Sequence, residues 1–161
     1  NENDIGDFKT FLKLSPPLRT EEDRNALVQG LVDEIIDVIV SDHKPEDEEN
    51  KRLTFAQAET GASGIETLLP LSLELYHNGS VKLETIIKAL TSSPAKILKI
   101  NKGNLSIGND ADFCIVDINK PWVVRKEKLI SKSKNTPIED KKLQGKVMNT
   151  FVNGEELFKA E

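Results

Sequence analysis

Two short apolar runs separated by a periodic segment open the chain, and this pattern predicts a strand, a helix and a second strand. The first run, residues 10–14, stops before Pro16 and Pro17, because proline cannot donate to a strand ladder. The second run, residues 37–41, holds a continuous apolar stretch of the kind found in strands buried on both faces of a parallel sheet. Together with the helix between them, the two runs predict a right-handed βαβ unit.

The segment between the runs has the pattern of a capped amphipathic helix. Thr20 is followed three residues later by Asp23, an acidic variant of the capping box, and acidic residues in a first turn suit the helix dipole. Apolar residues then recur at helical spacing and form one stripe, which consists of Leu27, Val28, Leu31, Val32 and Ile35. We therefore expect a helix that begins just after Thr20.

The character of the pattern changes near residue 100. Before it, helical spacing predicts helices over 65–76 and 83–90, and Ser93-Pro94 predicts the N-cap and first position of another. After it, short runs between turns predict strands at 105–108, 113–116, 122–124 and 146–152, with a hairpin turn at Asn153-Gly154. We therefore divide the chain into an α/β part, residues 1–100, and a small β part, residues 101–161.

The α/β part is incomplete by itself, because two parallel strands cannot cover both faces of a sheet or close its edges. The chain starts at Asn1 and its one methionine is Met148, so we expect the missing part to precede Asn1. A long polar loop, residues 43–63, follows the carboxyl end of the second apolar run. Loops at that end of the strands carry the active sites of α/β proteins.

Composition narrows the class of function. The chain has 161 residues, 37% hydrophobic and 30% charged, which suits a packed core. Its 22 basic and 27 acidic residues give a net charge of −5 without a basic stripe, which argues against a nucleic-acid partner. No apolar run approaches the roughly 18 residues of a membrane span. We expect neither a membrane partner nor a signal peptide.

Cysteine and histidine are scarce. Cys114 stands alone, so no internal disulfide can form; we interpret it as a small core residue of a protein from a reducing compartment. The two histidines, His43 and His77, cannot make a self-contained site with three histidine ligands. His43 follows Asp42 on the opposite side of an extended segment, and we interpret both histidines as structural.

Asp42 is the first candidate for chemistry. A carboxylate at the end of a buried strand can bind a metal ion or act as a general base, although an ordinary turn aspartate remains the alternative. Ser15 ends the other apolar run, at the same edge of the predicted sheet, where it could donate a hydrogen bond to a substrate or to the loop. Arg19 could bind a substrate carboxylate or equally pair with Glu22 or Asp23.

Six segments follow one another in order through nearly the whole chain. They are Ser-Pro-Pro-Leu-Arg-Thr-Glu-Glu-Asp-Arg (15–24), Ile-Asp-Val-Ile-Val-Ser-Asp-His-Lys-Pro (36–45), Gly-Ile-Glu-Thr-Leu-Leu-Pro (64–70), Ser-Pro-Ala-Lys-Ile-Leu (93–98), Asn-Asp-Ala-Asp-Phe-Cys-Ile-Val-Asp (109–117) and Ser-Lys-Asn-Thr-Pro (133–137). Together they resemble dihydroorotase, most closely its class I branch in the amidohydrolase superfamily. The resemblance implies an α/β fold: the C-terminal portion of a (β/α)8 TIM barrel plus part of a small β-sandwich domain. Residues 11–15 and 37–42 would be the seventh and eighth barrel strands.

The resemblance also implies a reaction, namely metal-dependent hydrolysis of a cyclic amide that interconverts carbamoyl aspartate and dihydroorotate in pyrimidine biosynthesis. Asp42 matches the family's eighth-strand aspartate, which binds the metal and carries the proton between hydroxide and leaving nitrogen. The implied cofactor is zinc, as one or two divalent ions whose other ligands would lie upstream of Asn1. The chain alone is therefore expected to be inactive, and the complete protein to be cytoplasmic.

Three positions near the implied site differ from the family pattern. Ser15 replaces an asparagine that contacts substrate, and Glu46 replaces a histidine that contacts substrate. Gly61 is kept, but Thr60 replaces the proline before it. Ser15, Glu46 and the backbone of Gly61 are thus the substrate-binding candidates. An anionic Glu46 would repel a substrate carboxylate by roughly 1 kcal/mol even in a water-like dielectric.

These differences support a second hypothesis, a non-catalytic dihydroorotase-like subunit that scaffolds aspartate transcarbamoylase, whereas Asp42 favours the enzyme. A third, an independent small α/β binding domain, would require the chain to fold cooperatively as a monomer, which we do not expect. The expected partners are the substrate, the N-terminal remainder of the same protein and further copies in a homo-oligomer. Aspartate transcarbamoylase would join them under the second hypothesis.

Overall fold

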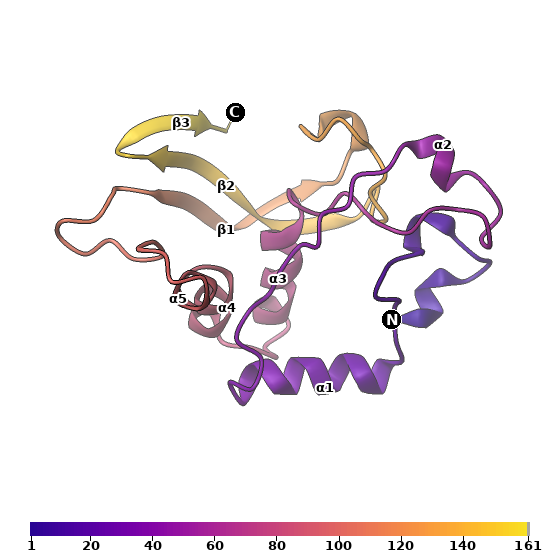
Figure 1. Cartoon of the computed structure of the whole chain (residues 1–161), viewed down its shortest axis with the longest axis horizontal. Coiled ribbons are helices and arrows are strands. Elements are labelled where there is room, and N and C mark those ends of the chain that lie inside the picture. The colour runs from indigo at the N-terminus through magenta and orange to yellow at the C-terminus, as the bar shows by residue number, and fades with distance from the viewer. Residues whose placement is uncertain (161) are drawn as a thin grey trace. The chain divides into compact units, whose positions relative to one another are not determined.

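The computed structural model describes residues 1–160, which form two compact units (Figure 1). Unit 1 comprises Asn1–Gln29, Ser41–Leu68 and Val123–Lys142, and unit 2 comprises Gly30–Val40, Leu69–Trp122 and Leu143–Glu161. The α-helices are α1 (Glu21–Val32), α2 (Glu48–Lys51), α3 (Leu68–His77), α4 (Leu83–Leu90) and α5 (Ser92–Ile97). The 3-10 turns are η1 (Glu2–Ile5), η2 (Thr10–Leu12) and η3 (Lys126–Lys128), and the strands are β1 (Phe113–Val123), β2 (Lys142–Val152) and β3 (Glu155–Lys159).

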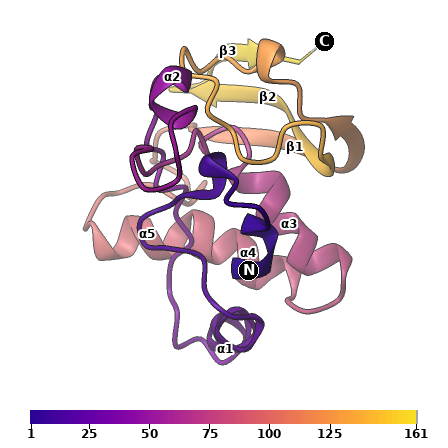
Figure 2. The same ribbon diagram turned by 90° about the vertical axis from the view of Figure 1, so that its right-hand side faces the viewer.

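The strands form one sheet in the order β1-β2-β3, with β2 between the other two (Figure 2). β2 and β3 pair antiparallel, with a register shift between Thr150 and Phe151. The predicted hairpin turn is confirmed: Asn153 and Gly154 have φ values of 52° and 81°, as a two-residue turn with both central residues left-handed requires. The sheet contacts α3 through β1, where His77 Nε2 lies 3.0 Å from the carbonyl oxygen of Ile118.

The core of unit 2 is apolar. Leu73 of α3 and Ile86 of α4 are fully buried, because the periodic apolar positions of both helices turn toward the same interior. A side chain at Gly145 of β2 would meet Leu73 Cδ1 at 2.4 Å, so the glycine permits the close approach of helix and strand. The interior is completed by Leu31, Val81, Ala89, Ala95 and Leu143.

The predicted helices are confirmed, with small changes at their ends. At α1, the Asp23 amide donates to Thr20 Oγ1 at 3.1 Å and the Thr20 amide donates to Asp23 Oδ2 at 3.2 Å, so the capping box is reciprocal. α4 has the predicted bounds, and α3 begins three residues later than predicted. The prediction of Ser93 as an N-cap is wrong: α5 begins at Ser92, after Thr91.

The two predicted parallel strands are absent from residues 1–160. Residues 10–12 form the 3-10 turn η2, and residues 37–41 have no regular secondary structure. The apolar pattern reports a tendency to be buried, but a strand also needs a neighbour to which its backbone can hydrogen-bond. Within the described chain Ile39 donates its amide to Ala89 of α4 instead, at 3.1 Å, and no βαβ unit forms.

Three further expectations need correction. Residues 105–108 do not form a strand: residues 105 and 106 have no regular secondary structure, and residues 107 and 108 lie in a turn in which Ile107 is fully exposed. The predicted strands 113–116 and 122–124 are parts of the single strand β1, which ends at Val123. Cys114 is exposed rather than part of the core, since it lies on a face of β1 that residues 1–160 leave open, with Sγ 3.5 Å from Thr150 Oγ1.

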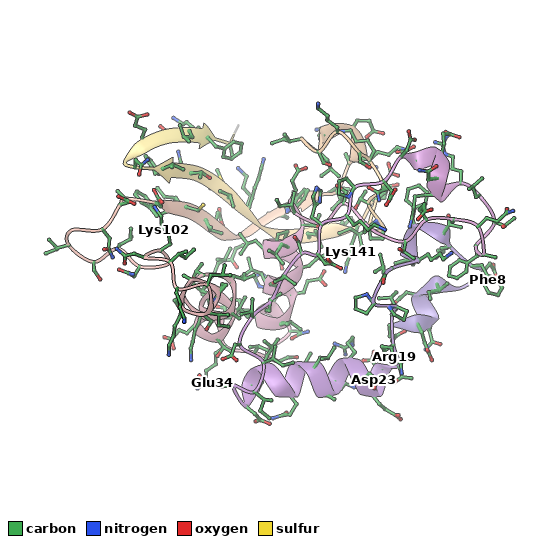
Figure 3. All side chains as sticks on the ribbon, in the orientation of Figure 1. Phe8, Arg19, Asp23, Glu34, Lys102 and Lys141 are labelled. Atoms are coloured by element: carbon green, nitrogen blue, oxygen red, sulfur yellow. The ribbon has the colours of Figure 1, made fainter. Side chains whose placement is uncertain are left out.

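The apolar stripe of α1 is largely uncovered by the part of the chain that the structure describes. Leu31 is buried, whereas Leu27, Val32 and the following Ile35 are exposed. At the other end of this helix Arg19 Nε pairs with Asp23 Oδ2 at 3.5 Å, so of its two expected carboxylate partners the structure pairs Arg19 with Asp23 (Figure 3). No helix within residues 1–160 is long and apolar enough to span a bilayer.

Candidate functional site

All four sequence-predicted site residues lie in loops of unit 1. Backbone hydrogen bonds join the segments that carry three of them, Ser15, Glu46 and Gly61. The Gly61 amide donates to the carbonyl of Lys13 at 3.0 Å, and the Lys44 amide donates to the carbonyl of Ala62 at 2.9 Å. The structure thus brings the end of the first apolar run, the start of the long loop and the Gly61 turn together.

Gly61 occupies a position that only glycine fits. Its φ is 130°, and a Cβ there would lie 2.8–2.9 Å from the aliphatic carbons of Lys44. Its backbone groups are also in use, because the amide binds Lys13 and the carbonyl accepts from Lys51 Nζ at 3.0 Å and Asn135 Nδ2 at 3.4 Å. The Gly61 turn is therefore held rigidly by the chain itself.

Lys51, at the end of α2, is the central contact of these loops. Its side chain is fully buried, and its ammonium donates to the carbonyl oxygens of Lys13, Glu59 and Gly61 at 3.1, 2.8 and 3.0 Å. Burial lowers the pKa of Lys51, because the charged form is taken out of water. The negative charge of Glu46 acts on this pKa in the opposite direction, because it favours the charged form of the lysine.

Asn135 makes a second buried polar junction. Its Nδ2 donates to the carbonyls of Lys44 at 3.3 Å and Gly61 at 3.4 Å, and its Oδ1 accepts from Ser133 Oγ at 2.7 Å. The Asn135 carbonyl also accepts the amide of Ser63 at 3.3 Å. Residues 133–136, which are distant in the sequence, thus hydrogen-bond to the long loop and hold it in place.

Asp42 sits at the sharp turn where the long loop begins. Its φ of 42° is left-handed, a conformation that aspartate tolerates better than most residues. Its side chain is exposed and makes no hydrogen bond or ion pair with residues 1–160, so both carboxylate oxygens are available. Its neighbour His43 is structural, as predicted: Nδ1 accepts the amide of Gly64 at 3.2 Å.

Glu46 is partly shielded rather than freely solvated. Its carboxylate lies 3.3 Å from Lys44 Nζ, and its side chain is 19% exposed. Its carbonyl accepts from the Ser133 hydroxyl. The cation beside Glu46 offsets part of the repulsion that its charge would exert on an anionic substrate. Ser15, by contrast, is exposed, and its side chain binds nothing in the described chain.

These residues do not make a metal site by themselves. Among the described residues, no three His, Cys, Asp or Glu side chains gather closely enough to hold an ion. Asp42 fits as a single carboxylate ligand, since its oxygens are free of other partners. Further ligands would have to come from outside the described residues.

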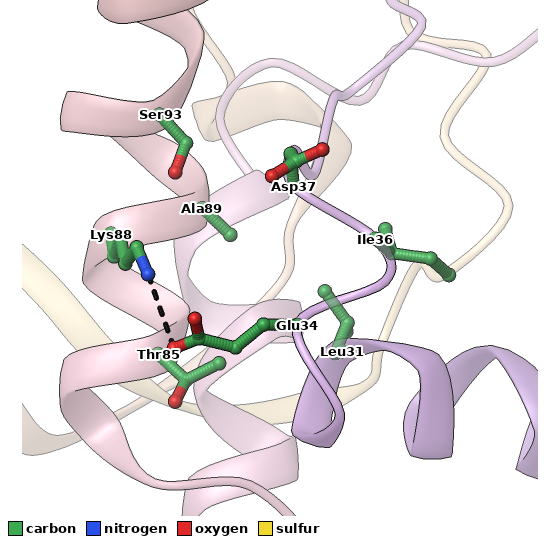
Figure 4. Close-up of a pocket in the computed structure, with 8 residues that line it drawn as sticks. All are labelled: Leu31, Glu34, Ile36, Asp37, Thr85, Lys88, Ala89 and Ser93. Carbon is green, nitrogen blue, oxygen red and sulfur yellow. Dashed lines mark ion pairs between the residues drawn. The ribbon is translucent and has the colours of Figure 1, made fainter.

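A small pocket in unit 2 contains none of the predicted site residues (Figure 4). Its volume is about 20 Å³, enough for a water molecule. Glu34 Oε1 and Lys88 Nζ, which line it, form an ion pair of 3.1 Å, and both side chains are more than half exposed. The pocket is too small and too open to hold a ring-sized ligand, so the chemistry is better sought in unit 1.

Sequence reasoning missed Lys51 and Asn135. Lys51 lies in the highly charged part of the predicted polar loop, and no local pattern marks it as buried. Asn135 belongs to the segment 133–137 that contributed to the resemblance, and this was the one signal that pointed to it.

The comparisons with known proteins agree on one family. The amidohydrolase family profile matches residues 13–157, and the chain belongs to this family. The chain is 44% identical over 160 residues to a dihydroorotase of Ehrlichia chaffeensis and covers 99% of itself and 36% of that protein. It is 41% identical over 148 residues to a dihydroorotase of Aquifex aeolicus, and the match covers 91% of this chain and 35% of that protein. The chain thus spans about a third of the length of the curated relatives it matches.

Solved structures confirm the predicted fold class. L-hydantoinase (dihydropyrimidinase) from Arthrobacter aurescens matches with a TM-score of 0.89 and 31% identity, over 98% of this chain and 36% of the other. Dihydropyrimidinase from Brevibacillus agri matches with a TM-score of 0.86 and 23% identity, over 96% and 35%. The chain is a part of the α/β fold of the amidohydrolases, which combines a (β/α)8 barrel with a small β domain.

Proposed function

We propose that the complete protein containing this chain is a dihydroorotase, a metal-dependent hydrolase that interconverts dihydroorotate and carbamoyl aspartate in pyrimidine biosynthesis. The observation that carries the proposal is the 41–44% identity to curated dihydroorotases over 91–100% of the chain. The proposal includes zinc as the ion, further copies of the protein as partners and a cytoplasmic location. Residues 1–100 would belong to the barrel and 101–161 to the small β domain.

Asp42 is assigned the central role. It would contribute one ligand to the metal and accept a proton at a carboxylate oxygen, then return it to the nitrogen that leaves when the ring opens. The exposed position of its carboxylate at the start of the loop supports this role. The chemistry that the ion would supply is activation of water for attack at neutral pH.

Ser15 and Glu46 are assigned to substrate binding, together with the turn at Gly61. Ser15 is exposed and can donate a hydrogen bond. The Gly61 backbone is already hydrogen-bonded within the chain, so it would act by shape, because the absence of a side chain lets a ligand approach. Glu46 beside Lys44 forms a nearly neutral pair, which would let an anionic substrate approach more easily than a lone glutamate would.

The decisive experiment is to purify the full-length protein, measure its metal content and follow dihydroorotate hydrolysis. The substitution Asp42→Asn should reduce kcat by about a thousandfold or more, because it removes both a metal ligand and the proton-accepting base. Asp7→Asn, which alters an exposed aspartate of unit 1, should leave kcat unchanged. Hydrolysis that survives Asp42→Asn would show that Asp42 is not the base.

The same assay should include hydantoin and dihydrouracil, which are cyclic amides without a carboxylate. The similarity to hydantoinase structures and the presence of Glu46 make these the informative alternative substrates. A full-length protein that hydrolyses them and leaves dihydroorotate intact would replace the proposed substrate by a neutral ring. A protein that hydrolyses none of them would overturn the proposed function.

A further inference from the structure

Lys51 is a fully buried cation whose three ammonium contacts are all neutral. The ammonium group presents three donors on one atom, and each donor reaches a backbone carbonyl at 2.8–3.1 Å. An apolar side chain of similar length would fill the same space without the cost of removing a charge from water. The contacts therefore suit a group that holds backbone in place rather than one that only fills a core.

The carbonyls come from two of the three segments that carry substrate-binding candidates. Lys13 lies two residues before Ser15, whereas Glu59 and Gly61 belong to the turn on the other side. Three carbonyl dipoles that converge on one point repel one another, and a cation at that point reverses the sign of the interaction. Lys51 thus makes the close approach of the two segments favourable.

Other contacts tie the same segments as well. One is direct, because the Gly61 amide donates to the same Lys13 carbonyl at 3.0 Å. The others reach neighbouring residues. Lys13 Nζ donates to the carbonyls of Ala56 at 3.1 Å and Ala58 at 2.7 Å, and the Thr10 hydroxyl donates to the carbonyl of Lys51. These bonds connect the first segment to the middle of the loop. Within residues 1–160, Lys51 Nζ is the one donor group that binds both the Lys13 carbonyl of the first segment and the Gly61 carbonyl of the turn.

We propose that Lys51 is a positioning residue that fixes the spacing between the Ser15 segment and the Gly61 turn and thereby sets substrate affinity. This inference rests on the proposed function, because it takes Ser15 and Gly61 as parts of the substrate site. It adds a residue that contacts no substrate and acts through the backbone it holds.

The test compares Lys51→Met with Lys128→Met in the full-length protein. Lys128 is an exposed lysine of unit 1, so its replacement removes the same charge without touching the loops. For Lys51→Met we expect KM for dihydroorotate to rise about tenfold or more while kcat and metal content change little. Amide hydrogen exchange at residues 59–63 should accelerate at the same time, while exchange in β2 stays unchanged.

Each readout separates the possible failures. Unchanged exchange at residues 59–63 would overturn the positioning role whatever the substrate is. Faster exchange with an unchanged KM would overturn the link to substrate affinity. If the unmodified protein does not hydrolyse dihydroorotate, the proposed function is overturned. The exchange measurement would still decide the positioning role.

A second variant covers the case in which Lys51→Met does not fold. Lys51→Arg keeps the positive charge, but a planar guanidinium cannot direct three donors from one nitrogen at three converging carbonyls. We expect this variant to fold, to raise KM and to accelerate exchange at residues 59–63. A folded Lys51→Arg with the KM and exchange of the unmodified protein would show that charge alone suffices, which would overturn the proposed geometry.

Discussion

The two units are built from different kinds of buried residue. Among the described residues of unit 2, the buried side chains are apolar with one exception, Ser72. In unit 1 the buried polar side chains are Lys51, Ser63, Thr67, Asn135 and Thr136, whereas the buried apolar ones are Ala58, Val124 and Leu129. Unit 2 is therefore stabilised mainly by removal of apolar surface from water, and unit 1 mainly by specific hydrogen bonds.

This difference is consistent with the proposed location of the site in unit 1. An apolar core is non-directional and tolerates substitutions that keep its volume, which suits a scaffold. A buried hydrogen-bond network fixes particular atoms, because each unsatisfied partner has a high cost. The candidate site lies in the unit where backbone positions are fixed in this way.

The largest effect on stability should come from the apolar core. Ile86→Ala in unit 2 should lower the free energy of unfolding by about 2–5 kcal/mol, because Ile86 is fully buried and its loss leaves a cavity. The adjacent Ile87 is 40% exposed, so Ile87→Ala should cost less than about 1 kcal/mol. Urea denaturation of the full-length variants measures both, and equal effects would contradict the assignment of the core.

The next effect concerns two glycines with positive φ, one in each unit. Gly61→Ala should cost about 2–4 kcal/mol, because backbone strain adds to the clash with Lys44. Gly79→Ala, after α3, should cost about 1 kcal/mol, since its φ is 76° but no atom lies within 4 Å of the added Cβ. Thermal denaturation gives the comparison, and a tolerant Gly61 would mean that the unit 1 loops are looser than described.

A smaller effect is expected at the start of α1. Thr20→Ala removes the hydroxyl that accepts the Asp23 amide and should lower stability by about 1 kcal/mol. Thr20→Ser keeps the acceptor and should restore most of the loss. If the alanine and serine variants unfold at the same urea concentration, the capping box does not contribute.

The smallest effect is electrostatic. The Arg24 guanidinium, followed by the Asn1 side-chain amide, lowers the pKa of Glu21 from 4.5 to about 2. A carboxyl whose pKa is lower in the folded state adds stability above its unfolded value and loses it as the pH falls, here between about 4.5 and 2. Carbon NMR titration of Glu21 reports the shift, and Arg24→Gln should return the pKa toward 4.5. Because the pair is exposed, added salt should weaken the effect.

The elements predicted correctly from the sequence are those that depend on neighbours in the chain. The capping box at Thr20, the helical spacing of α4 and the Asn153-Gly154 turn are each complete within a few residues. The strands expected at 10–14 and 37–41 depend on hydrogen-bond partners, and the described chain supplies no strand beside them.

The candidate site was predicted in part. Asp42 and Gly61 are at positions with special backbone geometry, although their assigned roles in catalysis and binding remain predictions. Lys51 and Asn135 could not be found from local pattern, because their side-chain partners other than Ser133 lie between 8 and 91 residues away. A lysine among charged residues is expected to be exposed to solvent unless the carbonyls that surround it in the folded chain are known.

The long separations around Asn135 also bear on the order of folding. Its bonds to Gly61 and Lys44 close intervals of 74 and 91 residues, whereas the β2–β3 hairpin pairs residues on either side of a two-residue turn. Hairpins form within about 1–10 μs, and contacts between distant residues form more slowly because more chain must be ordered first. During synthesis the loops of unit 1 cannot lock before residue 135 has left the ribosome, so the candidate site should be among the last parts of the molecule to take shape.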